Sequence, residues 1–131
     1  MGFTNVINNE LPGRDVLGWR AKFGVISPST NTVVEPEFHA MSVPGVTAHN
    51  ARIHIRDMNM ADDSGMERLL DQIREEIGGA VERVMTAEPD YMVMGMSAET
   101  FWGGMEGNRQ FIKQIHDLSG LQVATGAEAC E

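Results

Sequence analysis

The stretch DYMVMGMSAETFWGG, residues 90–104, decides the fold of this chain. It begins with an apolar run, Tyr91–Met94, of the kind that forms a strand buried on both faces of a parallel sheet. The run stops at Gly95, a short polar segment follows, and a helical pattern starts at Gly104. Because ligands of open parallel sheets bind at the carboxyl ends of strands, we expect the chemistry at residues 95–100. The same residues also suit an ordinary strand-to-helix turn, so the stretch alone leaves both interpretations open.

The segments around this stretch alternate between strand and helix patterns. Strands are predicted at residues 19–26 (WRAKFGVI), 46–55 (VTAHNARIHI) and 121–125 (LQVAT). Helices are predicted at residues 35–41, 64–85 and 104–119, with the first turn of another at residues 126–131. The inward face of the helix at 104–119 is expected to contain Phe111, Ile112, Ile115 and Leu118.

This alternation predicts the fold class: α/β, a flavodoxin-like four-stranded parallel sheet with helices on both faces. Crossovers between parallel strands are right-handed, which leaves few possible strand orders. We expect the order 2-1-3-4, because it places the loops after the first and third strands side by side at the switch point. At 131 residues the chain has the size of one domain. We therefore expect an irregular N-terminal arm at residues 1–19 and one α/β lobe at residues 20–131.

The composition narrows the possible partners. The chain is 42% apolar, which is typical of a globular protein. Its formal net charge of −9 argues against binding to nucleic acid or to anionic membranes. An anionic substrate must then be held by local donors, because the overall field opposes it. There is no apolar run as long as a membrane span, no signal-peptide pattern and one cysteine, so we expect a cytoplasmic protein without an internal disulfide.

Small polar residues follow the first and third predicted strands. The first loop contains Ser27, Pro28, Ser29, Thr30 and Asn31, and the other offers Ser97, Thr100 and the backbone N–H groups of residues 96–98. Such a cluster can hold a carboxylate or a developing enolate oxygen without a formal positive charge. The same residue types also make turns and helix caps, which remains the plain alternative for both loops.

Other groups of reactive residues give weaker signals. The four histidines, His39, His49, His54 and His116, lack metal-ligand spacing, so no metal site is expected. His49 and His54 are expected on opposite faces of one strand. The glycines after Met94 match neither a dinucleotide fingerprint nor a P-loop. The acids Glu35, Glu37 and Glu99 are interpreted as solvated residues near helix starts, and Cys130 as a buried structural thiol.

At this point the motifs resemble a known family. GVISPSTNTVVEPEFHAM, residues 24–41, resembles the N-terminal segment of the maleate cis-trans isomerases, which carry a similar Pro-x-x-Asn-Thr stretch before an acidic helix start. DYMVMGMSAETFWGG resembles the corresponding loop of arylmalonate decarboxylase. GLQVATGAEACE, residues 120–131, resembles the segment that opens the middle helix of the family. Both enzymes belong to the aspartate/glutamate racemase superfamily, and the resemblance runs from about Phe23 to the last residue.

The resemblance implies two similar α/β lobes with the active site between them and no cofactor. Racemases and maleate isomerases use two cysteines, one from each lobe, whereas arylmalonate decarboxylase keeps only the thiol of the second lobe as its proton donor. Position by position, the first cysteine would fall at Gly95. Ser97 and the backbone of Met96 would be oxyanion donors. Asn31 would bind a substrate carboxylate, with Pro28, Ser29 and Thr100 completing the substrate site.

These assignments favour a decarboxylase-like enzyme of a small dicarboxylate, because Gly95 cannot supply a thiol. The alternatives are cis-trans isomerisation of a maleate-like diacid and a carboxylate-binding or assembly lobe without turnover. The second lobe of the family is not expected within these residues, which suggests a fragment whose cleft face is exposed. We therefore also expect a homo-oligomer.

Overall fold

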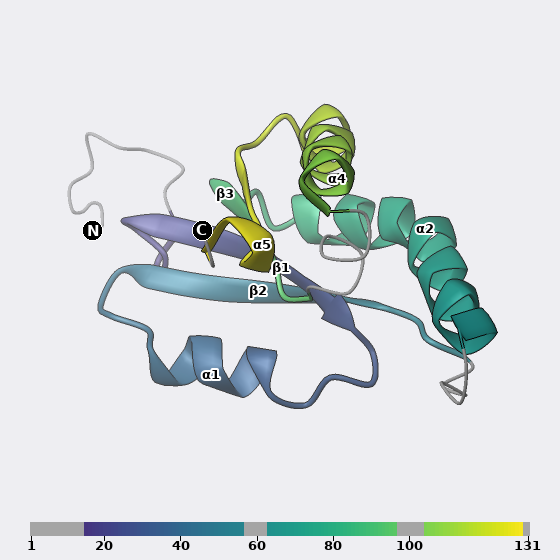
Figure 1. Ribbon diagram of the computed structural model, residues 1–131. Helices are drawn as coiled ribbons and strands as arrows, with labels where there is room; N and C mark the ends of the chain where they lie inside the picture. Colours follow the sequence, from purple (N-terminus) through teal and green to yellow (C-terminus); the bar gives the residue numbers. More distant parts are fainter. Residues whose placement is uncertain (1–14, 57–62, 97–103, 130–131) are drawn as a thin grey trace.

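The computed structural model describes residues 15–56, 63–96 and 104–129 (Figure 1). Its centre is a parallel sheet of β1 (Ala21–Pro28), β2 (Val46–Ile53), β3 (Tyr91–Met94) and β4 (Val123–Ala124). The strand order is β2-β1-β3-β4. The predicted α/β class and the predicted order are both confirmed, and β1 and β3 end next to one another.

Helices cover both faces of the sheet. The short helix α1 (Val34–Ala40) lies on one face, and the long helices α2 (Asp63–Met85) and α4 (Gly104–Ser119) lie on the other (Figure 1). A single turn, α5 (Gly126–Ala129), follows β4. None of the described helices combines the length and the apolar character that crossing a membrane requires.

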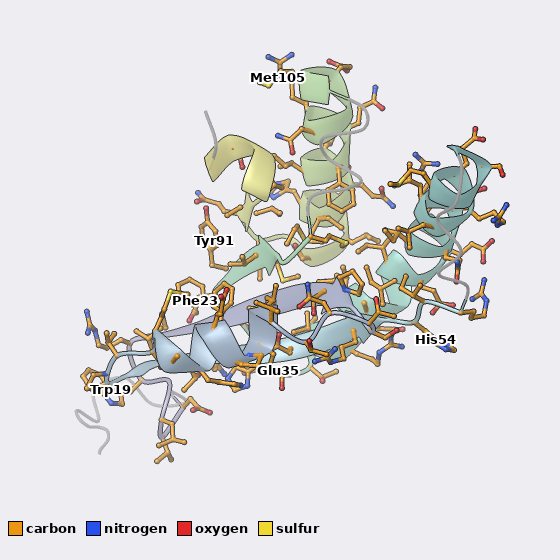
Figure 2. The ribbon with its side chains drawn as sticks, turned by 60° about the horizontal axis from the view of Figure 1, so that its bottom comes forward. Trp19, Phe23, Glu35, His54, Tyr91 and Met105 are labelled. Carbon is orange, nitrogen blue, oxygen red and sulfur yellow. The ribbon has the colours of Figure 1, made fainter. Side chains whose placement is uncertain are left out.

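Alternate residues of the strands divide between the two faces, as the pleat requires. The main core lies between the sheet and the helices α2 and α4, and it contains Ile26, Ala51, Ile53, Leu70, Ile73, Ile77, Val81, Met92, Met94, Phe111 and Ile115. On the α1 face, the rings of Phe23 and Tyr91 meet edge to face with centroids 6.3 Å apart (Figure 2). Along β1, Phe23, Val25 and Ser27 point to the same face, so the Ser27 side chain also faces α1.

The first strand is longer than predicted at its carboxyl end. Ser27 and Pro28 were expected in the loop, but they pair with Arg52 and Ile53 of β2 and end β1. Along β1, the backbone groups of successive residues point alternately to β3 and to β2. Ile26 O accepts the N–H of Gly95 on the β3 side, and the Ser29 N–H donates to Ile53 O on the β2 side. The backbone nitrogen of Pro28 therefore faces the β3 side, where the pairing with β3 ends at Ile26. Because proline has no N–H, its presence there removes no hydrogen bond between the strands.

The helix α4 begins and ends as predicted, but its inward face differs. Leu118 is 50% exposed, so its predicted burial is wrong. The buried stripe is Asn108, Phe111 and Ile115, whose spacing of three and four residues keeps them on one side of the helix. Asn108 has a buried partner at the end of β4, because the Thr125 hydroxyl donates to its Oδ1 at 3.0 Å. Thr125 also accepts the N–H of Glu128 at 3.3 Å and so caps α5.

Candidate functional site

The carboxyl ends of β1 and β3 and the start of α1 converge at Gly95. The N–H of Gly95 donates to Ile26 O at 2.7 Å, which fixes the end of β3 against β1. A Cβ placed on Gly95 would lie 2.8 Å from Val34 Cγ1, 3.2 Å from Ile26 O and 3.4 Å from Ser27 Cβ. The residues after the first and third strands are thus neighbours in space, as the strand order predicts.

Gly95 is a glycine for lack of space rather than for an unusual backbone. Among the described glycines, only Gly45 and Gly120 have positive φ. A carbon atom 2.8 Å from Val34 Cγ1 would overlap it, because carbon atoms in contact sit about 3.5–4.0 Å apart. The half-buried Val34 side chain therefore borders the point from which a side chain at position 95 would leave the backbone.

Asn31 holds the loop between β1 and α1. Its Oδ1 accepts hydrogen bonds from the N–H groups of Val33 and Val34, both at 2.9 Å. These bonds satisfy two backbone donors at the start of α1. The arrangement also fixes the orientation of the amide, and Nδ2 makes no hydrogen bond within the described residues. Asn31 thus keeps an unused N–H₂ group that suits an anionic oxygen.

Ser29 and Pro28, two other predicted binding residues, are tied to β2. The Ser29 Oγ accepts the N–H of Ile55 at 2.9 Å, and the Ser29 N–H donates to Ile53 O at 2.7 Å. Pro28 is half-buried as the last residue of β1. Ser29 retains its hydroxyl proton for donation, while its oxygen has a structural role.

Of the two predicted oxyanion residues, Met96 belongs to the described part of the chain and Ser97 does not. Ser97 and Thr100 lie outside the described residues, as do Glu99 and Cys130. The Met96 side chain packs against the core, so only its backbone is suited to the predicted role. The Met96 N–H has no hydrogen-bond partner in the described parts of the chain, whereas the Gly95 N–H is already used.

Two further residues lie at this site: Ser27, which was predicted in the polar cluster after the first strand, and Arg52, which was not assigned a role from the sequence. The Ser27 Oγ is buried without a hydrogen-bond partner among the described residues, beside Gly95. Arg52, near the end of β2, donates from Nη1 to Asn31 O at 2.8 Å and to Ser29 O at 3.2 Å. Its Nη2 lies 3.5 Å from Glu35 Oε1 in α1. The alternation of residues 46–55 carried a usable signal, because it places Arg52 on the same face as Ala48 and Asn50.

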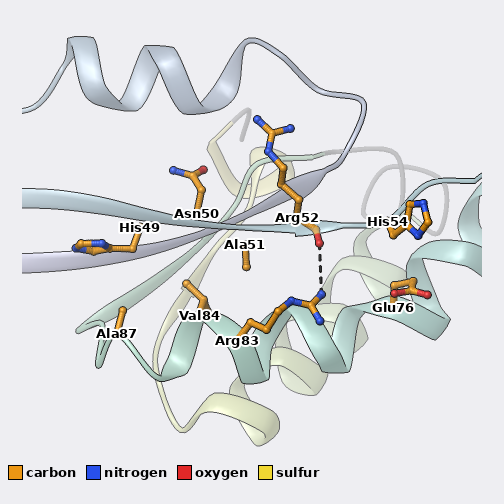
Figure 3. A pocket seen from close by; sticks show the side chains of 9 residues that line it. All are labelled: His49, Asn50, Ala51, Arg52, His54, Glu76, Arg83, Val84 and Ala87. Carbon is orange, nitrogen blue, oxygen red and sulfur yellow. Dashed lines mark hydrogen bonds between the residues drawn. The ribbon is translucent and has the colours of Figure 1, made fainter.

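A separate cavity of about 650 Å³ lies between β2 and α2 (Figure 3). His49 and His54 both line it, as do residues from both faces of β2, so this lining leaves the prediction that they face opposite sides untested. Ile53 and Ile55 are both buried in the core on either side of the exposed His54. Arg83 reaches across the cavity and donates to Arg52 O at 3.5 Å. Within residues 15–56, 63–96 and 104–129, no three His, Cys, Asp or Glu side chains are grouped as metal ligands would be.

Solved structures with a similar fold include maleate isomerases. The maleate cis-trans isomerase of Nocardia farcinica, in a form with a covalently bound succinylcysteine intermediate, matches with a TM-score of 0.66 and 18% identity over 84% of this chain and 46% of that one. The same enzyme bound to TRIS matches with a TM-score of 0.65. The maleate isomerase of Pseudomonas putida S16 with maleate gives 0.63 and 16% identity, with the same coverage.

These matches concern the fold. The chain spans about half the length of the isomerases. The described residues form one α/β lobe on a four-stranded parallel sheet. No family model matches the sequence, and no curated protein matches it.

Proposed function

We propose that this chain supplies one half of a cofactor-independent active site for a small dicarboxylate, of the arylmalonate decarboxylase type. In this reaction the C–C bond to one carboxylate breaks and CO₂ leaves. The bonding electron pair remains on the substrate as an enediolate. A thiol then transfers its proton to the α-carbon and becomes a thiolate. The sequence resemblance assigns that thiol to a second lobe, so the role of the described residues is to bind the dicarboxylate and stabilise the enediolate.

The observation that carries this proposal is the close packing of Gly95 against Val34. Two-cysteine chemistry needs a thiol on this loop, and even a Cβ at position 95 would lie 2.8 Å from Val34 Cγ1. Chemistry with one thiol requires no side chain there. It requires backbone donors that the substrate can approach closely, and glycine permits such an approach.

The roles of Asn31 and Met96 are proposed from their free donors among the described residues, and the role of Ser97 is proposed from the sequence resemblance. The Asn31 Nδ2 group holds the carboxylate that stays on the substrate. The Met96 N–H and Ser97 donate to the enediolate oxygens, which carry more negative charge in the transition state than in the bound diacid. Removing one such donor costs the chemical step roughly 3 kcal/mol. We therefore expect Ser97→Ala to lower kcat about 100-fold or more.

The second candidate is cis-trans isomerisation of a maleate-like diacid. It is favoured by the solved structures of similar fold, which are maleate cis-trans isomerases, one of them with maleate. It requires a second group able to attack the double bond, because position 95 supplies none.

Product analysis separates these functions. The protein is incubated in D₂O with phenylmalonate or with maleate, and the products are followed by NMR. Release of CO₂ and a single deuterium at the α-carbon support decarboxylation, and fumarate supports isomerisation. Binding of malonate or maleate without turnover supports a carboxylate-binding lobe. Turnover that survives alkylation of every thiol contradicts the proposed proton donor, and absence of both binding and turnover contradicts the whole proposal.

A further inference from the structure

We infer that Arg52 is a positioning residue that holds the loop between β1 and α1 in its carboxylate-binding conformation. The inference rests on the proposed role of Asn31 in holding a substrate carboxylate. Arg52 belongs to β2 and reaches the loop from there, where its guanidinium bonds to backbone carbonyl groups of the loop. Its guanidinium contacts both ends of the short segment Ser29 to Asn31.

The geometry is that of a clamp from β2 onto the loop. One nitrogen, Nη1, donates to Asn31 O at 2.8 Å and to Ser29 O at 3.2 Å. The second nitrogen, Nη2, reaches Glu35 Oε1 at 3.5 Å and so adds the first turn of α1. Figure 3 shows the Arg52 side chain on the α1 side of β2, while Arg83 bonds to its carbonyl oxygen from the other side.

The two carbonyl contacts matter more than the ion pair. The side chains of Arg52 and Glu35 are 37% and 38% exposed, and ion pairs with this exposure contribute little to stability. Hydrogen bonds from a charged donor to carbonyl oxygens are stronger than neutral ones, and here they fix two backbone positions. Because both oxygens accept hydrogen bonds from the Arg52 guanidinium, its positive charge offsets their partial negative charge, which reduces their repulsion of an anion bound at the Asn31 amide.

The clamp also supports the orientation of Asn31. The Asn31 carbonyl accepts from Arg52, while its side-chain Oδ1 accepts from Val33 and Val34. With both oxygen atoms engaged, Nδ2 is the group left for a ligand. A planar guanidinium can serve two carbonyls and a carboxylate at once, and a lysine ammonium at the same position lacks this fixed fork of donors.

Backbone amide exchange of the full chain without ligand tests the clamp directly. The variants are Arg52→Gln, Arg52→Lys and the control Arg56→Gln, since Arg56 pairs with Glu75 and Glu76 of α2, away from the loop. In Arg52→Gln we expect the Val33 and Val34 amides to exchange about tenfold faster, with core amides unchanged, because local opening is separate from global unfolding. Arg52→Lys is expected to fall between Arg52→Gln and the natural protein, and Arg56→Gln to match the latter. Unchanged exchange at Val33 and Val34 in Arg52→Gln, or equal acceleration in Arg56→Gln, would overturn the inference.

A malonate titration of the same proteins, followed by amide chemical shifts, links the clamp to binding. We expect the malonate Kd to rise about tenfold in Arg52→Gln and to remain unchanged in Arg56→Gln. An unchanged Kd in Arg52→Gln would contradict the positioning role even if the loop amides exchange faster. If the natural protein binds no malonate or maleate, the proposed function fails, and the exchange result still decides whether Arg52 clamps the loop.

Discussion

The contact between Gly95 and Val34 predicts a specific loss of stability on adding one carbon atom. In Gly95→Ala the new Cβ would lie 2.8 Å from Val34 Cγ1, about 1 Å inside the ordinary contact distance between carbon atoms. Overpacking of this kind costs about 1–3 kcal/mol. The lower entropy of the unfolded alanine chain offsets about 0.4–1 kcal/mol of that cost. We expect a net decrease in the free energy of unfolding of about 1–2 kcal/mol.

Urea unfolding of a double-mutant cycle checks this prediction. With a denaturant slope of about 2 kcal/mol per M, in the middle of the usual range, the midpoint of Gly95→Ala should fall by about 0.5–1 M. Val34→Ala removes the clashing atom, so the double variant should be at least about 0.5 kcal/mol more stable than the sum of the single effects. Gly78→Ala is the matched control, because nothing lies within 4 Å of its added Cβ. It should stabilise α2 by about 0.5–1 kcal/mol. Additive effects of Gly95→Ala and Val34→Ala would refute the steric argument.

Three further predictions concern single polar groups. Asn31→Asp keeps an oxygen for the α1 cap but replaces Nδ2, so the urea midpoint should hold while malonate affinity, measured by titration, falls at least about tenfold. The Gly18 N–H bond to Asp15 lowers the pKa of that carboxyl. Its contribution to stability is therefore present above the unfolded pKa and lost as the pH falls through the folded pKa, and the stability gap between the natural protein and Asp15→Asn should close on acidification. Thr125→Val leaves Asn108 Oδ1 buried without its donor and should cost about 1–3 kcal/mol by urea unfolding; an unchanged midpoint would contradict the importance of that hydrogen bond.

Features that depend on local periodicity could be predicted from the sequence. The apolar run Tyr91–Met94 and the helix Gly104–Ser119 each form the predicted element, because the pattern of apolar residues decides them. The strand order also followed, since right-handed crossovers and a switch point leave few choices. The loop after β1, which contains Asn31, and the loop after β3, which begins at Gly95, are adjacent because of that order.

Features that depend on contacts between distant segments could not be predicted in this way. The extension of β1 through Pro28 is set by pairing with β2, and no local signal in Ser27 or Pro28 indicates it. The role of Arg52 depends on carbonyl groups more than twenty positions earlier in the chain. Likewise, the local sequence around Gly95 indicates a turn residue, and only the contact with Val34 shows that position 95 lacks room for a side chain. In each case the deciding atom belongs to another element.

The position of β2 at the border of the sheet has a consequence for the behaviour of the protein in concentrated solution. An edge strand presents unpaired N–H and C=O groups to which a strand of another chain can hydrogen-bond, and natural proteins often protect such edges with charged side chains. Here the guanidinium of Arg83 lies over the β2 backbone at Arg52 O. An incoming strand would have to displace that cation from Arg52 O before it could pair there, so we expect Arg83 to oppose strand addition at this position.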